Sequence, residues 1–164
     1  MNARTLPAHP FGRTITLTNE IRIRRPASTV FDYLADLQHL PEWNYAIRDT
    51  RQLTPGIPGA STTYRQQRIL PHPLEERLKI VTHVPDRLLV FDGGLGPFTG
   101  RSTYRIDDAR GVTTLRNDIE LTPSVPLALL GHLASRNMTR AVGDNLRVLK
   151  SILEVPQVHD VSST

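Results

Sequence analysis

The stretch IRIRRPASTVFDYLADLQHLPEWN, from Ile21 to Asn44, decides how the rest of the chain can fold. It begins as a strand, and Pro26 ends that strand because proline cannot donate to a sheet ladder. A first short helix follows, predicted by apolar residues at helical spacing. These residues are Val30, Phe31 and Leu34. Pro41 can open a second short helix, with Trp43 and Ile47 on one of its sides.

The remaining sequence predicts a sheet followed by one long helix. Apolar and polar side chains alternate from Arg13 to Ile23, which indicates a long half-buried strand. After the two short helices, turn signals recur about every ten residues, which is typical of an antiparallel meander. The strands expected there include residues 61–70, 76–84, 87–92, 98–106 and 112–121. From Ser124 to Glu154 the apolar period changes to that of a helix.

Composition and charge limit the classes of protein that this chain can be. Its 164 residues suit one domain, expected over residues 13–155, with flexible tails at 1–12 and 156–164. The net charge is +4 and the arginines are scattered, so we do not expect nucleic-acid binding. We find no secretory signal and no apolar run of membrane-spanning length. We expect a cytoplasmic protein without membrane insertion; an oligomer is possible but unsupported.

The order of elements predicts an internal cavity. An α+β fold with seven antiparallel strands must curl its sheet to cover one long C-terminal helix, and such sheets curl through twist and bulges. A curled sheet around a single helix leaves space that short side chains do not fill. The two short helices would close one end of this space. Trp43 is then either a plug at that end or a wall that contacts a ligand.

Further segments, together with Ile21–Asn44, match a known pattern. They are PGIPGASTTY (Pro55–Tyr64), VPDRLLVF (Val84–Phe91), FTGRSTYRI (Phe98–Ile106), VTTLRNDIEL (Val112–Leu121) and DNLRVLKSILE (Asp144–Glu154). Through them the chain resembles the START-related SRPBCC superfamily, in its bacterial polyketide cyclase/dehydrase-like branch. The resemblance implies the helix-grip fold and a pocket for a lipid, a hormone or a polyketide. It also implies mobile loops at the pocket mouth, here Pro55–Ala60 and Gly93–Pro97.

Two asparagines are the sharpest site candidates. Asn19 and Asn117 each lie in the apolar row of a strand, and in the family's sheet order these two strands are neighbours. A buried amide without a partner costs roughly 1–3 kcal/mol, so both amides need partners. One interpretation is that they anchor a polar group of a ligand. The alternatives are that they bond each other, or that a bulge turns one of them outward.

The other candidates would supply shape and apolar contact. The binding residues that we predict besides the two asparagines are Trp43, Tyr64, Phe91, Tyr104, Met138 and Ala141. The strand that carries Tyr64 is polar on both sides, so its inward face is unresolved. If the Tyr64 face points inward, Gln66 and Arg68 line a polar part of the pocket. The tyrosines could equally be core rings whose hydroxyls reach the rim.

No motif for catalysis or metal binding stands out. The six histidines show no ligand spacing, so we expect no metal and no cofactor. His83 is the best candidate for a general base, although a surface strand histidine is the simpler interpretation. We therefore expect a protein that binds a small hydrophobic or amphipathic molecule, such as a lipid, an isoprenoid or an aromatic polyketide. The alternatives are a polyketide aromatase/cyclase or dehydratase, and a protein-interaction module with a collapsed cavity.

Overall fold

The computed structural model describes residues 13–124 and 135–155. The expected tails lie outside these residues, as does the part of the long helix expected at 125–134. In chain order the elements are β1 (Ile15–Ile23), α1 (Ala27–Ala35), η1 (Leu37–His39), α2 (Leu40–Trp43), β2 (Ile47–Gln52), β3 (Thr63–Arg68), β4 (Leu74–Val84), β5 (Leu88–Gly94), β6 (Phe98–Ala109), β7 (Val112–Pro123) and α3 (Ser135–Glu154).

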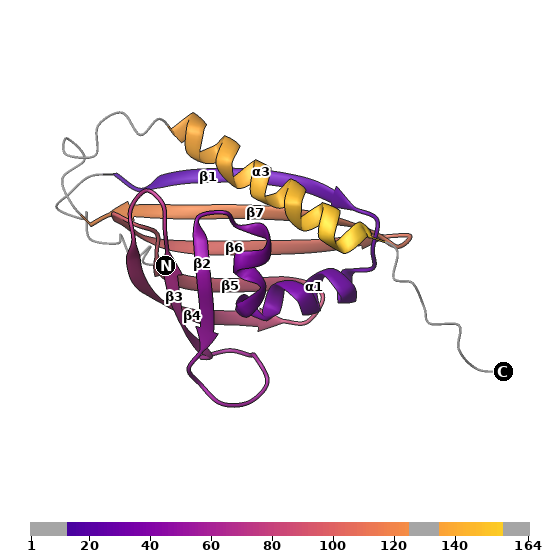
Figure 1. Cartoon of the computed structure of the whole chain (residues 1–164). Helices are drawn as coiled ribbons and strands as arrows, with labels where there is room; N and C mark the ends of the chain where they lie inside the picture. The colour runs from indigo at the N-terminus through magenta and orange to yellow at the C-terminus, as the bar shows by residue number, and fades with distance from the viewer. Residues whose placement is uncertain (1–12, 125–134, 156–164) are drawn as a thin grey trace, which may run out of the picture.

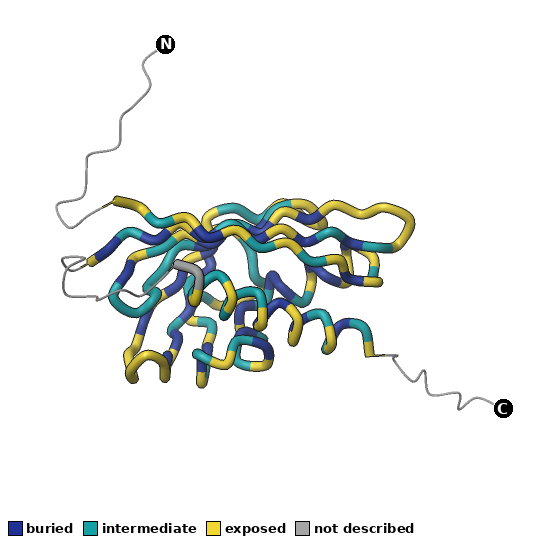
Figure 2. Tube along the Cα trace, turned by 90° about the horizontal axis from the view of Figure 1, so that it is seen from above, coloured by how far each residue is buried: buried dark blue, intermediate teal, exposed yellow. Residues whose placement is uncertain are grey.

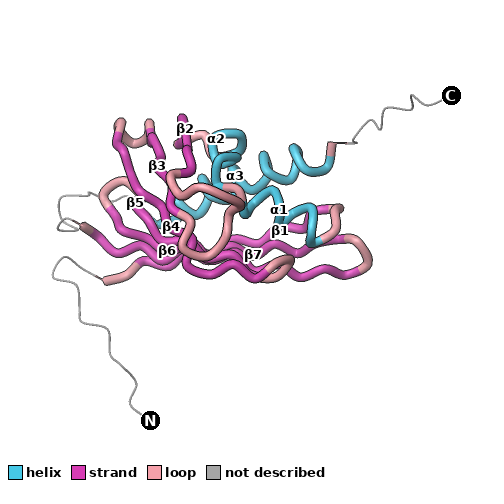
Figure 3. The backbone as a smooth tube through the Cα atoms, turned by 90° about the horizontal axis from the view of Figure 1, so that it is seen from below, coloured by secondary structure: helices cyan, strands magenta, loops and turns pink. Residues whose placement is uncertain are grey.

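The strands form one seven-stranded antiparallel sheet in the order β1-β7-β6-β5-β4-β3-β2. The first and last strands are therefore neighbours, as expected. All helices lie on one face of the sheet, and α3 runs across β1 and β7 (Figure 1). Seen along its edge, the sheet curls so that β2 and β3 rise beside α2 (Figure 3). The predicted helix-grip fold is confirmed.

The opening stretch folds into short helices because of two prolines and an aspartate. Pro26, in extended conformation, precedes α1, whose buried face consists of Ala27, Val30, Phe31, Leu34 and Ala35. The Asp36 carboxylate accepts a hydrogen bond from the Gln38 backbone N–H at 3.0 Å and so caps η1. Pro41 lies in the first turn of α2, where its missing N–H costs nothing.

The structure corrects one detail of this stretch. The prediction that Ile47 lies on the second helix is wrong, because α2 ends at Trp43 and Ile47 begins β2. Asn44 leaves the helical conformation, with φ −110° and ψ 99°. Its side-chain oxygen accepts a hydrogen bond from the Ala46 backbone N–H at 3.1 Å. This local turn, which competes with helix continuation, redirects the chain into the sheet.

Buried apolar side chains form two separate clusters. The larger one packs α1 and the C-terminal half of α3 against the sheet, and includes Phe31, Leu115 and Leu149. The smaller one consists of Leu17, Phe98, Ile119 and Leu121, with Met138 and Val142 of α3 packed against it. Buried and exposed residues alternate along the strands, so the sheet has one apolar and one polar face (Figure 2).

Candidate ligand-binding cavity

A cavity of about 300 Å³ lies beside the smaller apolar cluster. Three connections border it: the segment between α2 and β2, the β3–β4 turn and the β5–β6 turn. Tyr45, Leu70 and Pro71 from the first two connections line it, and sequence analysis did not identify them. These residues lie in short loops without a periodic pattern, so the sequence does not indicate that their side chains point toward the cavity.

Helix α3 contributes one face to the cavity. The residues on this face follow helical spacing and are Met138, Ala141, Val142 and Asn145. Opposite them, Gly100 of β6 allows close packing of the wall. A Cβ atom there would lie 2.5 Å from Leu95 Cδ1 and 3.1 Å from Leu121 Cδ2. Two small residues, Gly100 and Ala141, therefore form part of the cavity wall.

The structure brings six of the eight predicted binding residues to this cavity. The six are Trp43, Phe91, Tyr104, Asn117, Met138 and Ala141. Asn19 and Tyr64 are not among the residues that line it. Tyr64 is fully buried in the larger cluster. Burial, and to a lesser extent the Asp36 charge, raise the pKa of Tyr64 to about 12, although its interaction with the Leu37 backbone lowers the pKa. The Tyr64 face of β3 does point inward, but Tyr64 itself packs beyond the cavity.

Two aromatic rings form part of the wall. Phe91 and Tyr104 stack with their centroids 5.9 Å apart and their planes at 25°. Burial raises the pKa of Tyr104, because the phenolate would be desolvated there. Tyr104 is therefore a neutral phenol at physiological pH and can serve as a hydrogen-bond donor, not as a base.

A buried ion pair lies in the wall between β3 and β4. Arg68 Nε lies 3.0 Å from Glu76 Oε2, and the two side chains are 8% and 2% exposed. Glu76 also accepts hydrogen bonds from Gln66 Nε2 at 2.7 Å and from the Gly96 backbone N–H at 2.6 Å. Within the described residues, no hydrogen bond reaches the two terminal nitrogens of Arg68. Arg68 and Gln66 line the cavity, so it has one cationic wall.

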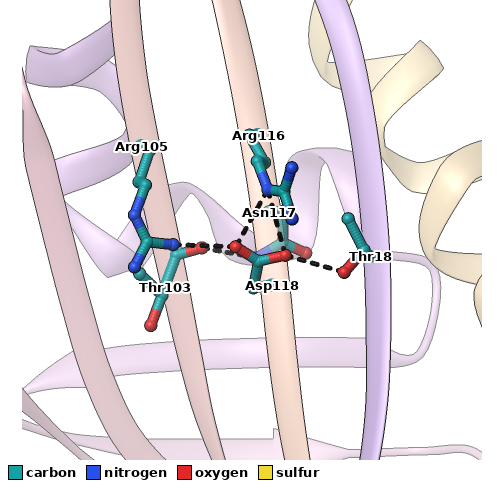
Figure 4. A network of polar contacts seen from close by, with 6 residues as sticks. All are labelled: Thr18, Thr103, Arg105, Arg116, Asn117 and Asp118. Atoms are coloured by element: carbon teal, nitrogen blue, oxygen red, sulfur yellow. Dashed lines mark hydrogen bonds and ion pairs between the residues drawn. The ribbon is translucent and has the colours of Figure 1, made fainter.

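The two predicted asparagines face the interior and lie directly opposite each other in the β1–β7 register. Asn117 is fully buried, and its Nδ2 donates to the Thr103 carbonyl at 3.4 Å. Figure 4 shows this contact and the outward Asp118, which binds Arg105, Arg116 and Thr18. The pKa of Asp118 is lowered, mainly by its hydrogen bond from Arg116. No hydrogen bond joins the Asn19 and Asn117 amides in the described structure.

Only one of the two loops expected at the mouth is there. Gly93, Gly94, Leu95 and Pro97 line the cavity, whereas none of Pro55–Ala60 does. The expectation for Pro55–Ala60 is wrong because this loop joins β2 to β3 at the other end of the sheet. Gly93 and Gly94 also belong to β5 and are not turn residues.

The described part of the chain offers little for metal or acid–base chemistry. It contains no group of three His, Cys, Asp or Glu residues able to hold a metal ion. His83 packs edge-on against Phe31, with centroids 4.9 Å apart, and does not line the cavity. Among the described lining residues there is neither a histidine nor a carboxylate. In the same ranges, no helix is long and apolar enough to cross a membrane.

Comparison with known proteins decides the family. The model of the family described as "Polyketide cyclase / dehydrase and lipid transport" matches residues 14–154. The chain belongs to this family. The family match thus covers β1 to the end of α3, including every element that borders the cavity. Among curated proteins, none matches the sequence of this family member.

Solved structures of similar fold include proteins of several kinds. The Zhui aromatase/cyclase from Streptomyces sp. R1128 has a TM-score of 0.74 at 11% identity, covering 93% of this chain and 100% of that one. Norcoclaurine synthase from Thalictrum flavum has a TM-score of 0.68 at 13% identity, covering 92% of this chain and 99% of that one. A START superfamily protein from Mycobacterium smegmatis has a TM-score of 0.63 at 16% identity, covering 85% of this chain and 94% of that one. At these identities the likeness establishes the helix-grip fold of this family member and nothing about its ligand.

Proposed function

We propose that this protein binds one small amphipathic molecule, of lipid, isoprenoid or aromatic polyketide type, in the cavity between its sheet and α3. The observation that carries the proposal is a cavity of about 300 Å³ with mostly apolar walls and one cationic group, Arg68. Ligand pockets are typically apolar, with a few placed polar groups that fix orientation, and begin at roughly this volume. The six predicted residues at the cavity are proposed to contact the ligand.

Arg68 is proposed to bind an oxygen of the ligand. Its Nε is occupied by Glu76, while its terminal nitrogens make no hydrogen bond within the described residues. A guanidinium donates to carboxylate and carbonyl oxygens in a fixed planar geometry. Because Glu76 holds the guanidinium in place, a ligand oxygen meets a preorganised donor and not a flexible surface side chain.

The test uses a variant in which a larger side chain on α3 fills the cavity. The wild-type protein and an Ala141→Phe variant are purified from the native host and compared by native mass spectrometry, before and after denaturing extraction. We expect the wild type to release a molecule of a few hundred daltons that Ala141→Phe does not retain. Val148→Phe is the matched control, because Val148 is an exposed residue of the same helix.

A second measurement works with added probe. Anilinonaphthalene sulfonate at about 100 times its Kd should raise the Tm of the wild type by about 5–10 °C, by mass action. It should leave the Tm of Ala141→Phe unchanged. If the wild type arrives empty and the probe does not shift its Tm, or if Ala141→Phe responds like Val148→Phe, the proposed binding function is wrong.

A polyketide cyclase or dehydratase activity is the second candidate, and Arg68 favours it. A buried cation that borders a cavity stabilises the oxyanion of an enolising carbonyl. Such a reaction also needs a group that accepts a proton, and the described lining residues include no histidine or carboxylate. Binding is therefore the better supported function. A cavity of about 300 Å³ also favours binding over an interaction module with a collapsed cavity.

A further inference from the structure

Three asparagines, of which Asn117 and Asn145 are buried and Asn19 is half-buried, form a polar layer between the two apolar clusters. Along β1, Asn19 lies between Leu17 of the smaller cluster and Ile21 of the larger one. Along β7, Asn117 lies between Ile119 and Leu115 in the same way. On α3, Asn145 lies between Val142, which packs on the smaller cluster, and Leu146 of the larger cluster. Asn145 is the third member of the layer.

The layer borders the inner end of the cavity. Asn117 and Asn145 line the cavity, and their side chains are 0% and 7% exposed. Asn19 lies beside Asn117 on the neighbouring strand, with its Oδ1 only 3.0 Å from the position that a Cβ on Gly143 would occupy. Helix α3 thus approaches the sheet closely at Asn19.

The layer contains unpartnered acceptors that border the cavity. Three of its buried side-chain atoms have no hydrogen-bond partner in the described structure: Asn19 Nδ2, Asn117 Oδ1 and Asn145 Oδ1. Buried polar atoms in native proteins are nearly always partnered, so these three atoms indicate a missing interaction. Asn19 Nδ2 carries two N–H groups but bonds neither oxygen in the described structure, and Asn19 does not line the cavity. Asn117 and Asn145 do line it, so their two oxygens are open to a donor inside the cavity.

We propose that the ligand carries a hydroxyl group at its inner end, and that this hydroxyl donates a hydrogen bond to Asn117 Oδ1 or Asn145 Oδ1. This inference rests on the proposed binding function and deepens it. A hydroxyl fits this layer better than a carbonyl or an ether oxygen, because only the hydroxyl donates. The cavity then has two chemically different poles: Arg68, which donates to a ligand oxygen, and the asparagines, which accept from a ligand hydroxyl.

The test compares two probes of nearly the same size and shape. 2-Naphthol carries a hydroxyl where 2-methylnaphthalene carries a methyl group, and both Kd values are measured by calorimetry on the whole chain. Because the hydroxyl also loses hydrogen bonds to water, the quantity compared is the ratio Kd(2-methylnaphthalene)/Kd(2-naphthol). We expect this ratio to fall about tenfold in Asn117→Leu or Asn145→Leu, the factor that one lost hydrogen bond of about 1.4 kcal/mol produces.

Ser102→Ala is the matched control, because Ser102 is a buried polar residue of the same cavity outside the layer. Its ratio should stay within twofold of the wild type. A ratio that falls in Ser102→Ala and not in the asparagine variants overturns the inference. If neither asparagine variant folds, the wild type alone decides: 2-methoxynaphthalene, which cannot donate, should bind about tenfold more weakly than 2-naphthol.

The same experiment separates this inference from the proposed function. If neither naphthalene binds to the wild type, the proposed cavity-binding function fails and the hydroxyl inference fails with it. If both probes bind and the ratio does not change in the asparagine variants, the protein does bind apolar molecules and only the hydroxyl inference is wrong.

Discussion

At the scale of single residues, the buried Arg68–Glu76 pair distinguishes the cavity wall from an ordinary core. Removing a charge from water costs several kcal/mol, which attraction and hydrogen bonds must offset. Glu76 meets this need with donors from Gln66, Arg68 and Gly96, whereas Arg68 leaves its terminal nitrogens free within the described residues. A pair kept only for stability would be satisfied on both sides, so the free side of Arg68 supports a binding role.

We predict that Glu76→Ala destabilises the protein by about 3–5 kcal/mol, because it leaves the Arg68 charge buried and unpaired. The measurement is urea unfolding followed by Trp43 fluorescence. The double variant Arg68→Met with Glu76→Met should recover most of the loss, since it removes both charges.

The control for this prediction is the exposed pair Arg65–Glu75 of the same two strands, with its charged atoms 3.6 Å apart. Glu75→Ala should cost less than about 1 kcal/mol, because water screens that pair. Equal costs for Glu75→Ala and Glu76→Ala would contradict the assignment of Glu76 as the buried partner.

At the scale of elements, the end of β5 depends on a close approach that only glycine allows. A Cβ on Gly93 would lie 2.3 Å from Leu78 Cδ2 and 2.7 Å from the Arg77 carbonyl oxygen. The backbone oxygen cannot move aside without shifting β4. We therefore predict that Gly93→Ala costs about 1–3 kcal/mol of stability and weakens probe binding, because this strand end lines the cavity.

The matched control is Gly59→Ala in the β2–β3 loop, where a Cβ meets nothing within 4 Å. Its stability should stay the same or rise by about 0.4–1 kcal/mol, since alanine reduces the freedom of the unfolded chain. Both variants are compared by thermal unfolding and by titration with the probe. A Gly93→Ala protein as stable as the wild type would show that β5 and β4 can separate there at no cost.

The elements that the sequence predicted well are those with an uninterrupted period. The rows of β1 and β7 predicted that Asn19 and Asn117 face inward on neighbouring strands, and the register places them directly opposite each other. Ile47 was placed on the wrong element because the Asn44 turn that ends α2 is a side-chain hydrogen bond without periodicity. The sequence left the inward face of the Tyr64 strand open, because that strand is polar on both sides. Tyr64 points inward but packs beyond the cavity, since parity gives direction and not distance along the cavity.

At the scale of the whole molecule, the asparagine layer divides the space between sheet and helices into two halves that share the cavity unequally. The larger cluster fills the half that includes α1 and the end of α3. The other half has the smaller cluster, whose four core residues all line the cavity. Of the larger cluster only a minority lines it: Leu40, Trp43, Leu78, Phe91 and Tyr104. Neither half could be recognised from the sequence, since both have the same strands and the same helix. The difference arises from where α3 approaches the sheet, at Gly143 and Asn19.

This division predicts that the two halves exchange their amide hydrogens differently. Local opening is easier where fewer buried apolar contacts oppose it. Residues 98–102 of β6 and 119–121 of β7, beside the cavity, should therefore exchange faster than residues 105–107 and 113–115 of the same strands. Hydrogen–deuterium exchange followed by mass spectrometry measures both sets in one sample. Adding 2-naphthol should slow exchange in the cavity half, because the ligand stabilises only structures that bind it. Uniform protection along both strands, or equal slowing of both halves by the probe, would mean that the protein opens as one unit and that the layer does not divide it.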